Sequence, residues 1–254
     1  MRVLATIKRV PITGGRIVLT EDSRAIDTRH LGFTMSPHEE CGVEEAVRII
    51  EANKGDSVVL TLGPPEAVEQ LRDAMALGID RAIHLQTDGS EWDGEATAAA
   101  ITDAIRADEA AAGPFDIIFF GNESADSGGF QVGIRVAYAL GRPCVTGLKK
   151  VTLEGAGVRC EQEVEGGRDV YEVPLPAVLT VKEGLNLPRY PSVPGKMRAR
   201  SKPVAVSTLP RPAPRLELMR LAVPAGQGRR AESLGSGAPA APAVVDLLQK
   251  AGVL

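Results

Sequence analysis

Glycines, small hydroxyl residues and carboxylates gather in residues 121–133, directly after the most apolar run of the chain, residues 116–120. Glycines let a backbone approach phosphate groups closely, and the N-terminus of a following helix supplies N–H donors and a positive dipole. A loop that only turns the chain, with Asp126 and Ser127 as helix caps, is the simpler alternative. We favour a nucleotide-binding loop. It is not a Walker A loop, because no Gly-Lys-Ser/Thr follows. Its candidate binding residues are Gly121, Asn122, Glu123, Ser124, Ala125, Asp126, Ser127, Gly128, Gly129, Phe130, Gln131 and Val132.

A second polar group, residues 35–40, precedes a helical pattern of apolar residues that starts at Val43. His38, Glu39 and Glu40 suggest a metal site or an acid–base pair. Three adjacent residues cannot all reach one ion without ligands from elsewhere, so an acidic helix N-terminus is the favoured interpretation. The sequence contains no Gly-x-Ser-x-Gly elbow, and no cysteine has a neighbouring histidine, so it indicates neither a catalytic residue nor a metal site.

Prolines, cations and apolar side chains alternate in residues 186–198. Proline favours an extended segment, and Val193 lies between two prolines. An apolar anchor among cations suits the docking of another protein, whereas a plain connector is the alternative. The candidate docking residues are Arg189, Tyr190, Pro191, Ser192, Val193, Pro194, Gly195, Lys196, Met197 and Arg198.

Strand and helix patterns alternate as far as residue 144, which indicates parallel βαβ units and, with right-handed crossovers, a doubly wound α/β sheet. In such a sheet, ligands bind at the carboxyl ends of the strands, where the loop 121–133 lies. Strands are expected over residues 3–7, 57–62, 81–86 and 116–120, and helices over residues 43–53, 66–77, 94–111 and 129–140.

The pattern changes beyond residue 144. We expect short antiparallel strands over residues 149–153, 158–165 and 169–173, a buried strand over 177–181, and a hairpin near Gly14 and Gly15. From about residue 203, proline, alanine, glycine and arginine dominate without helix or strand periodicity, until an amphipathic helix at 244–250. We therefore predict an α/β domain over residues 1–202 and a C-terminal arm over residues 203–254, whose apolar helix needs a partner surface.

Composition excludes several classes of function. Of the 254 residues, 44% are hydrophobic and 24% charged, as in ordinary globular proteins. The net charge of −4 and an aromatic content of 4% do not favour binding to nucleic acid. The sequence has no apolar stretch of about 18 residues and no signal-peptide pattern, so we expect no membrane insertion. Three widely spaced cysteines fit reduced thiols in the cytoplasm.

Five segments, in order along nearly the whole chain, resemble the beta (small) subunit of electron-transfer flavoproteins. They are residues 2–10, 43–48, 63–64 with 77–84, 165–167 with 175–180, and 186–190 with Met197. The resemblance implies an electron carrier without bond-making catalysis of its own, paired with an alpha subunit that holds most of the FAD site. It also implies electron donation by dehydrogenases such as acyl-CoA dehydrogenases, and a downstream quinone oxidoreductase as acceptor.

The resemblance further implies that this subunit binds AMP. The positions that match the family's AMP site are Thr6, Ser36, Pro37, His38, Glu39, Leu62 and residues 121–132. Residues 189–198 match the loop that anchors partner dehydrogenases, with Val193 at the apolar anchor.

Other functions remain open from the sequence. Residues 131–133 match electron-bifurcating members of the family, which hold a second FAD in place of AMP, but Ile134 replaces their usual proline, and we favour AMP. Thr13 and His38 stand where related proteins often place aromatic residues near the flavin. A stand-alone adenine-nucleotide hydrolase or ligase would need a metal or nucleophile site. A nucleotide-binding scaffold protein without redox partners would not need residues 186–198.

Overall fold

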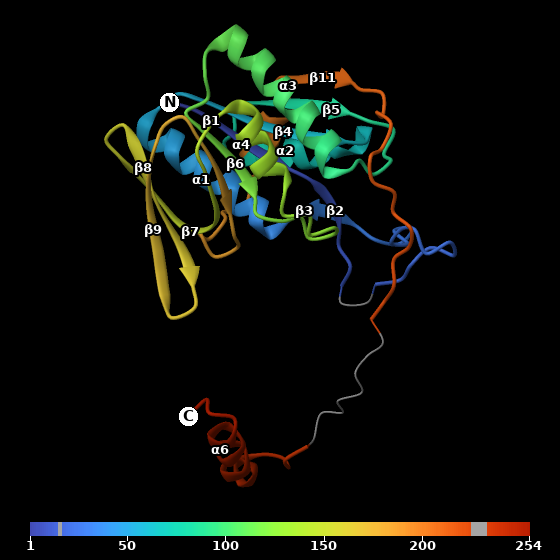
Figure 1. The fold of residues 1–254 in the computed structure, drawn as a ribbon, viewed down its shortest axis with the longest axis vertical. Helices are drawn as coiled ribbons and strands as arrows, with labels where there is room; N and C mark the ends of the chain where they lie inside the picture. Colours follow the sequence, from blue (N-terminus) through green and yellow to red (C-terminus); the bar gives the residue numbers. More distant parts are fainter. Residues whose placement is uncertain (15–16, 225–232) are drawn as a thin grey trace.

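The computed structural model describes residues 1–14, 17–224 and 233–254, and its centre is a nine-stranded sheet (Figure 1). The strand order is β11-β5-β4-β1-β6-β10-β7-β8-β9. Every neighbouring pair from β11 to β7 is parallel, and β8 and β9 extend the sheet as an antiparallel meander. The bounds are β1 Arg2–Ile7, β4 Asp56–Gly63, β5 Arg81–Gln86, β6 Ile117–Gly121, β7 Cys144–Glu154, β8 Gly157–Val164, β9 Gly167–Pro174, β10 Ala177–Val181 and β11 Val204–Thr208.

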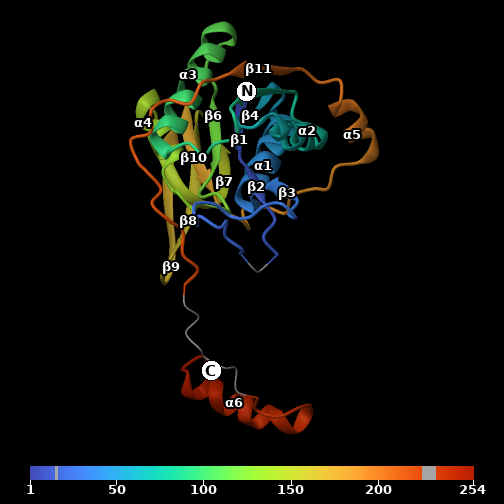
Figure 2. The same cartoon turned by 90° about the vertical axis from the view of Figure 1, so that its right-hand side faces the viewer.

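Helices cover both faces of the sheet, so the predicted doubly wound α/β fold is confirmed (Figure 2). Helices α1 and α2 pack on one face, with α5 against α2, and α3 and α4 pack on the other. The bounds are α1 Pro37–Asn53, η1 Pro65–Ala67, α2 Val68–Leu77, α3 Gly94–Ala112, α4 Val132–Leu140, α5 Val193–Ala199, η2 Ala238–Ala240 and α6 Ala241–Lys250.

The central strand β1 has a neighbour from each half of the fold. Residues Val3 to Ile7 are buried, because helices cover both faces of this strand. On one side β1 pairs with β4, and on the other with β6, which the chain reaches only after β5 and α3. From the carboxyl end of β1 the chain continues to β4 on one side, and from the carboxyl end of β6 it continues to β7 on the other side. In such sheets, a crevice forms between two strands whose connections run in opposite directions.

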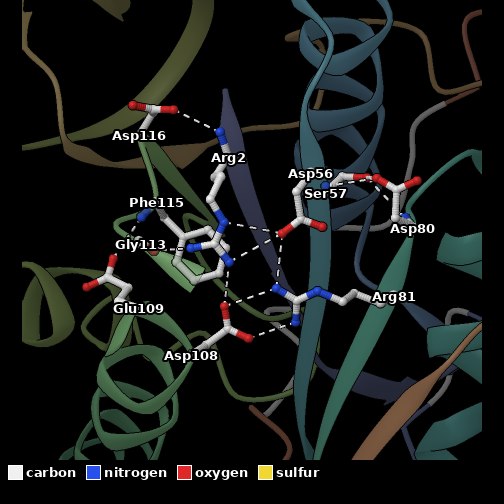
Figure 3. A network of polar contacts seen from close by, with 10 residues as sticks. All are labelled: Arg2, Asp56, Ser57, Asp80, Arg81, Asp108, Glu109, Gly113, Phe115 and Asp116. Atoms are coloured by element: carbon white, nitrogen blue, oxygen red, sulfur yellow. Dashed lines mark hydrogen bonds and ion pairs between the residues drawn. The ribbon is translucent and has the colours of Figure 1, made fainter. Parts of the chain in front are cut away.

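Ion pairs join the opposite, amino-terminal edge of the sheet (Figure 3). The Arg2 guanidinium contacts Asp56 at 3.3 Å and Asp108 at 2.6 Å, and Arg81 contacts the same two carboxylates at 3.0 and 2.7 Å. The Arg2 guanidinium also lies 4.3 Å from the centre of the Phe115 ring. These contacts tie β1, β4 and β5 to the end of α3. The polar cluster therefore stabilises the arrangement of these strands at the edge of the sheet opposite the crevice.

Several predicted boundaries are wrong. Helix α1 begins six residues earlier than predicted, at Pro37, a residue that fits the first turn of a helix. Helix α4 begins at Val132, not at residue 129, because Phe130 has a left-handed backbone with a φ of 55°. Strand β7 begins at Cys144, before the predicted residue 149.

Two segments differ in type from the prediction. Residues 193–199 form the helix α5, where an extended loop is predicted, because Pro194 occupies its first turn. Residues 204–208 form β11 beside β5, where an arm without regular structure is predicted. The predicted hairpin near Gly14 and Gly15 lies partly outside the described residues. A separate two-stranded antiparallel sheet pairs β2 (Arg9–Pro11) with β3 (Phe33–Met35), and the longer segment 12–32 lies between these two strands.

The predicted C-terminal helix is confirmed as α6, which is drawn apart from the sheet in Figures 1 and 2. None of its residues is buried; Val244, Val245 and Leu247 are exposed, and Leu248 is partly exposed. No helix in the described part of the chain is long and apolar enough to cross a lipid bilayer.

Candidate functional site

A cleft of about 510 Å³ opens at the carboxyl end of the sheet, beyond β6 and β10. Its volume lies within the range of about 300–1,000 Å³ that is usual for small-molecule sites. The loop after β6, the start of α1 and the residues after β10 supply its walls. The lining residues are Ser36, Pro37, His38, Glu123, Ser124, Ala125, Asp126, Ser127, Gly128 and Glu183.

Lys8 joins the cleft loop to the centre of the sheet. It follows β1, and its ammonium contacts Asp126 at 2.8 Å and Glu91 at 2.7 Å. Burial alone would lower the pKa of Lys8, but the two carboxylates outweigh it and raise that pKa. Burial alone would raise the pKa of Asp126, but Lys8 and hydrogen bonds from serines outweigh it and lower that pKa. The pair therefore stays charged and fixes the loop to β1.

Glu39 is a buried carboxyl group behind the cleft. Its Oε2 accepts hydrogen bonds from the backbone N–H of Lys8 at 2.8 Å and of Ser36 at 3.3 Å. Burial raises the pKa of Glu39 to about 8, against the opposing effect of these two hydrogen bonds. A Cβ at Gly121 would lie 2.7 Å from the Glu39 Cγ, so a larger residue at the start of the loop would displace Glu39.

We expect Glu39→Gln to remove a pH dependence of stability. Between about pH 4.5 and 8 the folded chain holds a proton on Glu39 that the unfolded chain has lost, so wild-type stability falls as pH rises through this window. A glutamine keeps the acceptor oxygen and never ionises. At pH 8 the variant should exceed wild type in free energy of unfolding by up to about 4 kcal/mol, and at pH 4.5 the two should agree.

Urea unfolding at pH 4.5, 6 and 8 measures this difference. Glu163→Gln, at an exposed position in β8, is the matched control and should follow wild type at each pH. If the free energy of unfolding of Glu39→Gln changed with pH in the same way as that of wild type, Glu39 would keep its charge when the chain folds.

The cleft loop is held by its own polar groups and leads to an open helix end. The Ser124 and Ser127 hydroxyl groups lie 2.9 Å apart, and the Gly128 N–H donates to the Ser124 carbonyl at 3.0 Å. Gly128 has a φ of 55°, which glycine adopts readily. Helix α4 then starts without a side-chain cap in the described structure, so its first N–H groups can bind an anion.

His38 lines the cleft between carboxylates. Burial lowers its pKa, although Glu123 and Glu183 act in the opposite direction. Its Nδ1 is buried and has no hydrogen-bond partner among the described residues. In the same part of the chain, no three His, Cys, Asp or Glu side chains gather in a way that could hold a metal ion.

The structure brings together part of the predicted nucleotide set. Ser36, Pro37 and His38 face residues 123–128 across the cleft. Thr6 lies within the sheet, where its hydroxyl donates to the Phe119 carbonyl at 3.1 Å, and Leu62 packs against the core. Glu39, Gly121 and Asn122 lie next to the lining, and residues 129–132 continue from it into α4.

Sequence reasoning missed two charged residues at this site, Lys8 and Glu183. Both follow parallel strands, β1 and β10, that lie on either side of β6. Their position after a buried strand is a signal that could have indicated them, once the order of the strands was known.

Most of the predicted docking residues form an exposed surface on and before α5, whereas Gly195 is buried. Tyr190, Val193 and Met197 are 96%, 72% and 67% exposed, and Lys196 and Arg198 are exposed beside them. Arg189, in contrast, is paired within the chain: its guanidinium contacts Glu44 at 2.9 Å and Glu51 at 2.7 Å. It therefore fixes the segment to α1 and is not a free cation of the surface.

Comparisons with known proteins agree with one another. A family described as "Electron transfer flavoprotein domain" matches residues 24–212. The chain is 36% identical over 213 residues to the electron transfer flavoprotein subunit beta of Mycobacterium tuberculosis, which covers 82% of this chain and 79% of the relative. It is 33% identical to the Bacillus subtilis subunit beta, covering 80% and 77%. It is 35% identical to the mitochondrial subunit beta of Arabidopsis thaliana, covering 82% of both chains.

Fold and cleft together define an open α/β protein with a cleft at the carboxyl end of its sheet, where sheets of this kind bind their ligands. The chain belongs to the electron transfer flavoprotein family, and its relatives in that family are beta subunits. Membership of this family supports a role in electron transfer.

Proposed function

We propose that this chain is the beta subunit of a heterodimeric flavoprotein that carries electrons from dehydrogenases, such as acyl-CoA dehydrogenases, to a downstream quinone oxidoreductase. Family membership supports this proposal, and the observation that carries the part played by this chain is the cleft between residues 36–38 and 123–128. The nucleotide-binding domain would extend beyond the predicted boundary at residue 202 to the end of β11 at Thr208, because β11 belongs to its sheet, and the residues after β11 would form the arm toward the alpha subunit. The free thiols of Cys41, Cys144 and Cys160 are consistent with action in the cytoplasm.

AMP is the nucleotide that we propose for the cleft. Carboxylates such as Glu123 and Asp126 accept hydrogen bonds, which fits the ribose hydroxyl groups and the adenine amino group. The uncapped first turn of α4 offers N–H donors for the phosphate. FAD, held mostly by the alpha subunit, supplies the electron-transfer chemistry. In this proposal His38 and Thr13 belong to the part of this chain that faces the flavin.

The nucleotides bound by the purified heterodimer test the proposal. Denaturation should release one FAD and one AMP per heterodimer, identified by chromatography and mass spectrometry. Two FAD and no AMP would instead identify an electron-bifurcating flavoprotein, which the sequence of residues 131–133 leaves open. A preparation without flavin or alpha subunit would contradict an electron-carrier function.

The surface of α5 is the proposed docking site for the dehydrogenase. Val193 is an exposed apolar anchor of a size that contributes roughly 1–2 kcal/mol when a partner pocket desolvates it. We expect Val193→Ala to raise the KM for the flavoprotein in reduction by an acyl-CoA dehydrogenase by about tenfold or less. The contents of FAD and AMP should not change.

Neutralising Lys196 and Arg198 should act differently, slowing association mainly at low salt because salt screens steering charges. Val164→Ala, at an exposed apolar position on β8, is the control and should leave the KM unchanged. If the Val193 and charge variants match wild type at every ionic strength, α5 is not the docking element.

A further inference from the structure

We propose that α2 and α5 are held together by an exchange of cationic side chains, in which a cation from each helix or its end binds carbonyl groups at the end of the other helix. The docking surface therefore has its binding conformation before a partner arrives. Arg72 and Lys202 are the positioning residues of this exchange. The inference rests on the proposed docking function of α5 and concerns how that surface is prepared. Neither residue lies on the exposed docking surface itself.

The first half of the exchange runs from α2 to α5. The Arg72 guanidinium donates to the Ala199 carbonyl at 2.5 Å and to the Lys202 carbonyl at 2.7 Å. These groups lie at and just beyond the last residue of α5. Carbonyl groups at a helix C-terminus lack partners within the helix and carry partial negative charge, so a cation here stabilises the helix end.

The second half runs in the opposite direction. The Lys202 ammonium donates to the carbonyl groups of Met75 at 3.0 Å, Gly78 at 3.4 Å and Ile79 at 2.5 Å. Met75 belongs to the last turn of α2, and Gly78 and Ile79 follow its end. All three donor positions of the ammonium are therefore used at the end of α2.

The backbones of the two helices touch between these charged contacts. Gly195 is buried, and a Cβ at this position would lie 2.5 Å from the Ala76 carbonyl oxygen of α2. Ala199, one turn later, is buried as well. Only small residues allow this approach, and it turns the opposite side of α5, with Val193 and Met197, toward solvent.

The segment is also fixed on both sides of α5. Before the helix, Arg189 is paired with Glu44 and Glu51 of α1. After the helix, the chain enters β11, which is paired with β5. A helix of seven residues is not stable alone in water, so its conformation depends on these contacts. A surface fixed in advance binds without the entropic cost of ordering it at the moment of contact.

Replacing Lys202 by methionine tests the inference, because the side chain keeps its apolar stem and loses its donors. In the FAD-loaded heterodimer, we expect Lys202→Met to raise the KM for the flavoprotein about five- to tenfold, with kcat unchanged. Hydrogen exchange of the amides in residues 195–200 should accelerate. Arg72→Met should act in the same way, and Lys202→Arg should restore most of the wild-type KM. Lys150→Met, at an exposed lysine of β7, is the control.

Two outcomes would overturn the inference. One is unchanged exchange in residues 195–200 for both Lys202→Met and Arg72→Met. The other is faster exchange with an unchanged KM, since binding would then not need a surface ordered in advance. These outcomes differ from a failure of the proposed docking function itself. If α5 were not the docking element, Val193→Ala would leave the KM unchanged, even where Lys202→Met accelerates hydrogen exchange.

Discussion

Replacing Gly129 by glutamate should abolish AMP binding by the heterodimer while the fold of this chain persists. Gly129 is exposed, and a Cβ there would meet only the Gln131 side chain, at 4.0 Å. The substitution is therefore sterically accommodated in the chain alone. In the complex it would add a negative charge beside the proposed phosphate position, in a loop that already carries Glu123 and Asp126.

The size of this effect follows from electrostatics. Two unit charges of the same sign about 4 Å apart repel by roughly 4 kcal/mol at an effective dielectric constant of 20. We therefore expect AMP affinity to fall by at least about a hundredfold. The measurement is the AMP content of the purified heterodimer, with thermal unfolding of the isolated chain as the test of folding. Gly129→Gln, of nearly the same size and without charge, should retain most of the AMP. If the Gly129→Glu heterodimer contained the normal amount of AMP, this loop would not bind the phosphate.

Ending the chain after Pro224 should weaken assembly with the alpha subunit by a few hundredfold. The deletion removes α6, none of whose residues is buried against the described part of this chain. Burial of four half-exposed Val and Leu side chains at about 1 kcal/mol each contributes roughly 4 kcal/mol. The cut lies beyond β11 and beyond Arg211 and Arg215, which contact the Glu91 carbonyl and the Glu95 carboxylate, so the α/β body should remain folded.

The affinity between the two subunits, measured by titration, decides this prediction. Asp246→Asn in the full chain removes a charge of α6 but none of its apolar area, and it should assemble like wild type. If the shortened chain binds the alpha subunit as tightly as the full chain, α6 is not part of the interface.

Local patterns were sufficient for most of the sheet. The strands at residues 81–86 and 177–181 have the predicted bounds, because short apolar runs ended by polar or glycine residues indicate buried strands directly. β11 could not be predicted in the same way. Its residues are largely exposed, and what makes them a strand is pairing with β5, which lies far away in the sequence.

The candidate site was predictable in part for a similar reason. The loop 121–128 carries its own glycine and serine signal. Lys8 and Glu183 join it only because β1 and β10 both lie beside β6, and strand order is a non-local property. The protonation of Glu39 depends on burial behind Gly121, which adjacent sequence does not indicate.

The place of β11 in the sheet has a consequence for the protein during its synthesis on the ribosome. β5 is made early, but its outer edge stays open until residues 204–208 have left the ribosome and paired with it. An open strand edge is a template for pairing with other chains. Nascent or prematurely terminated chains that end before β11 therefore expose a strand edge with which other chains can pair. Molecular chaperones would have to shield this edge until residues 204–208 are made.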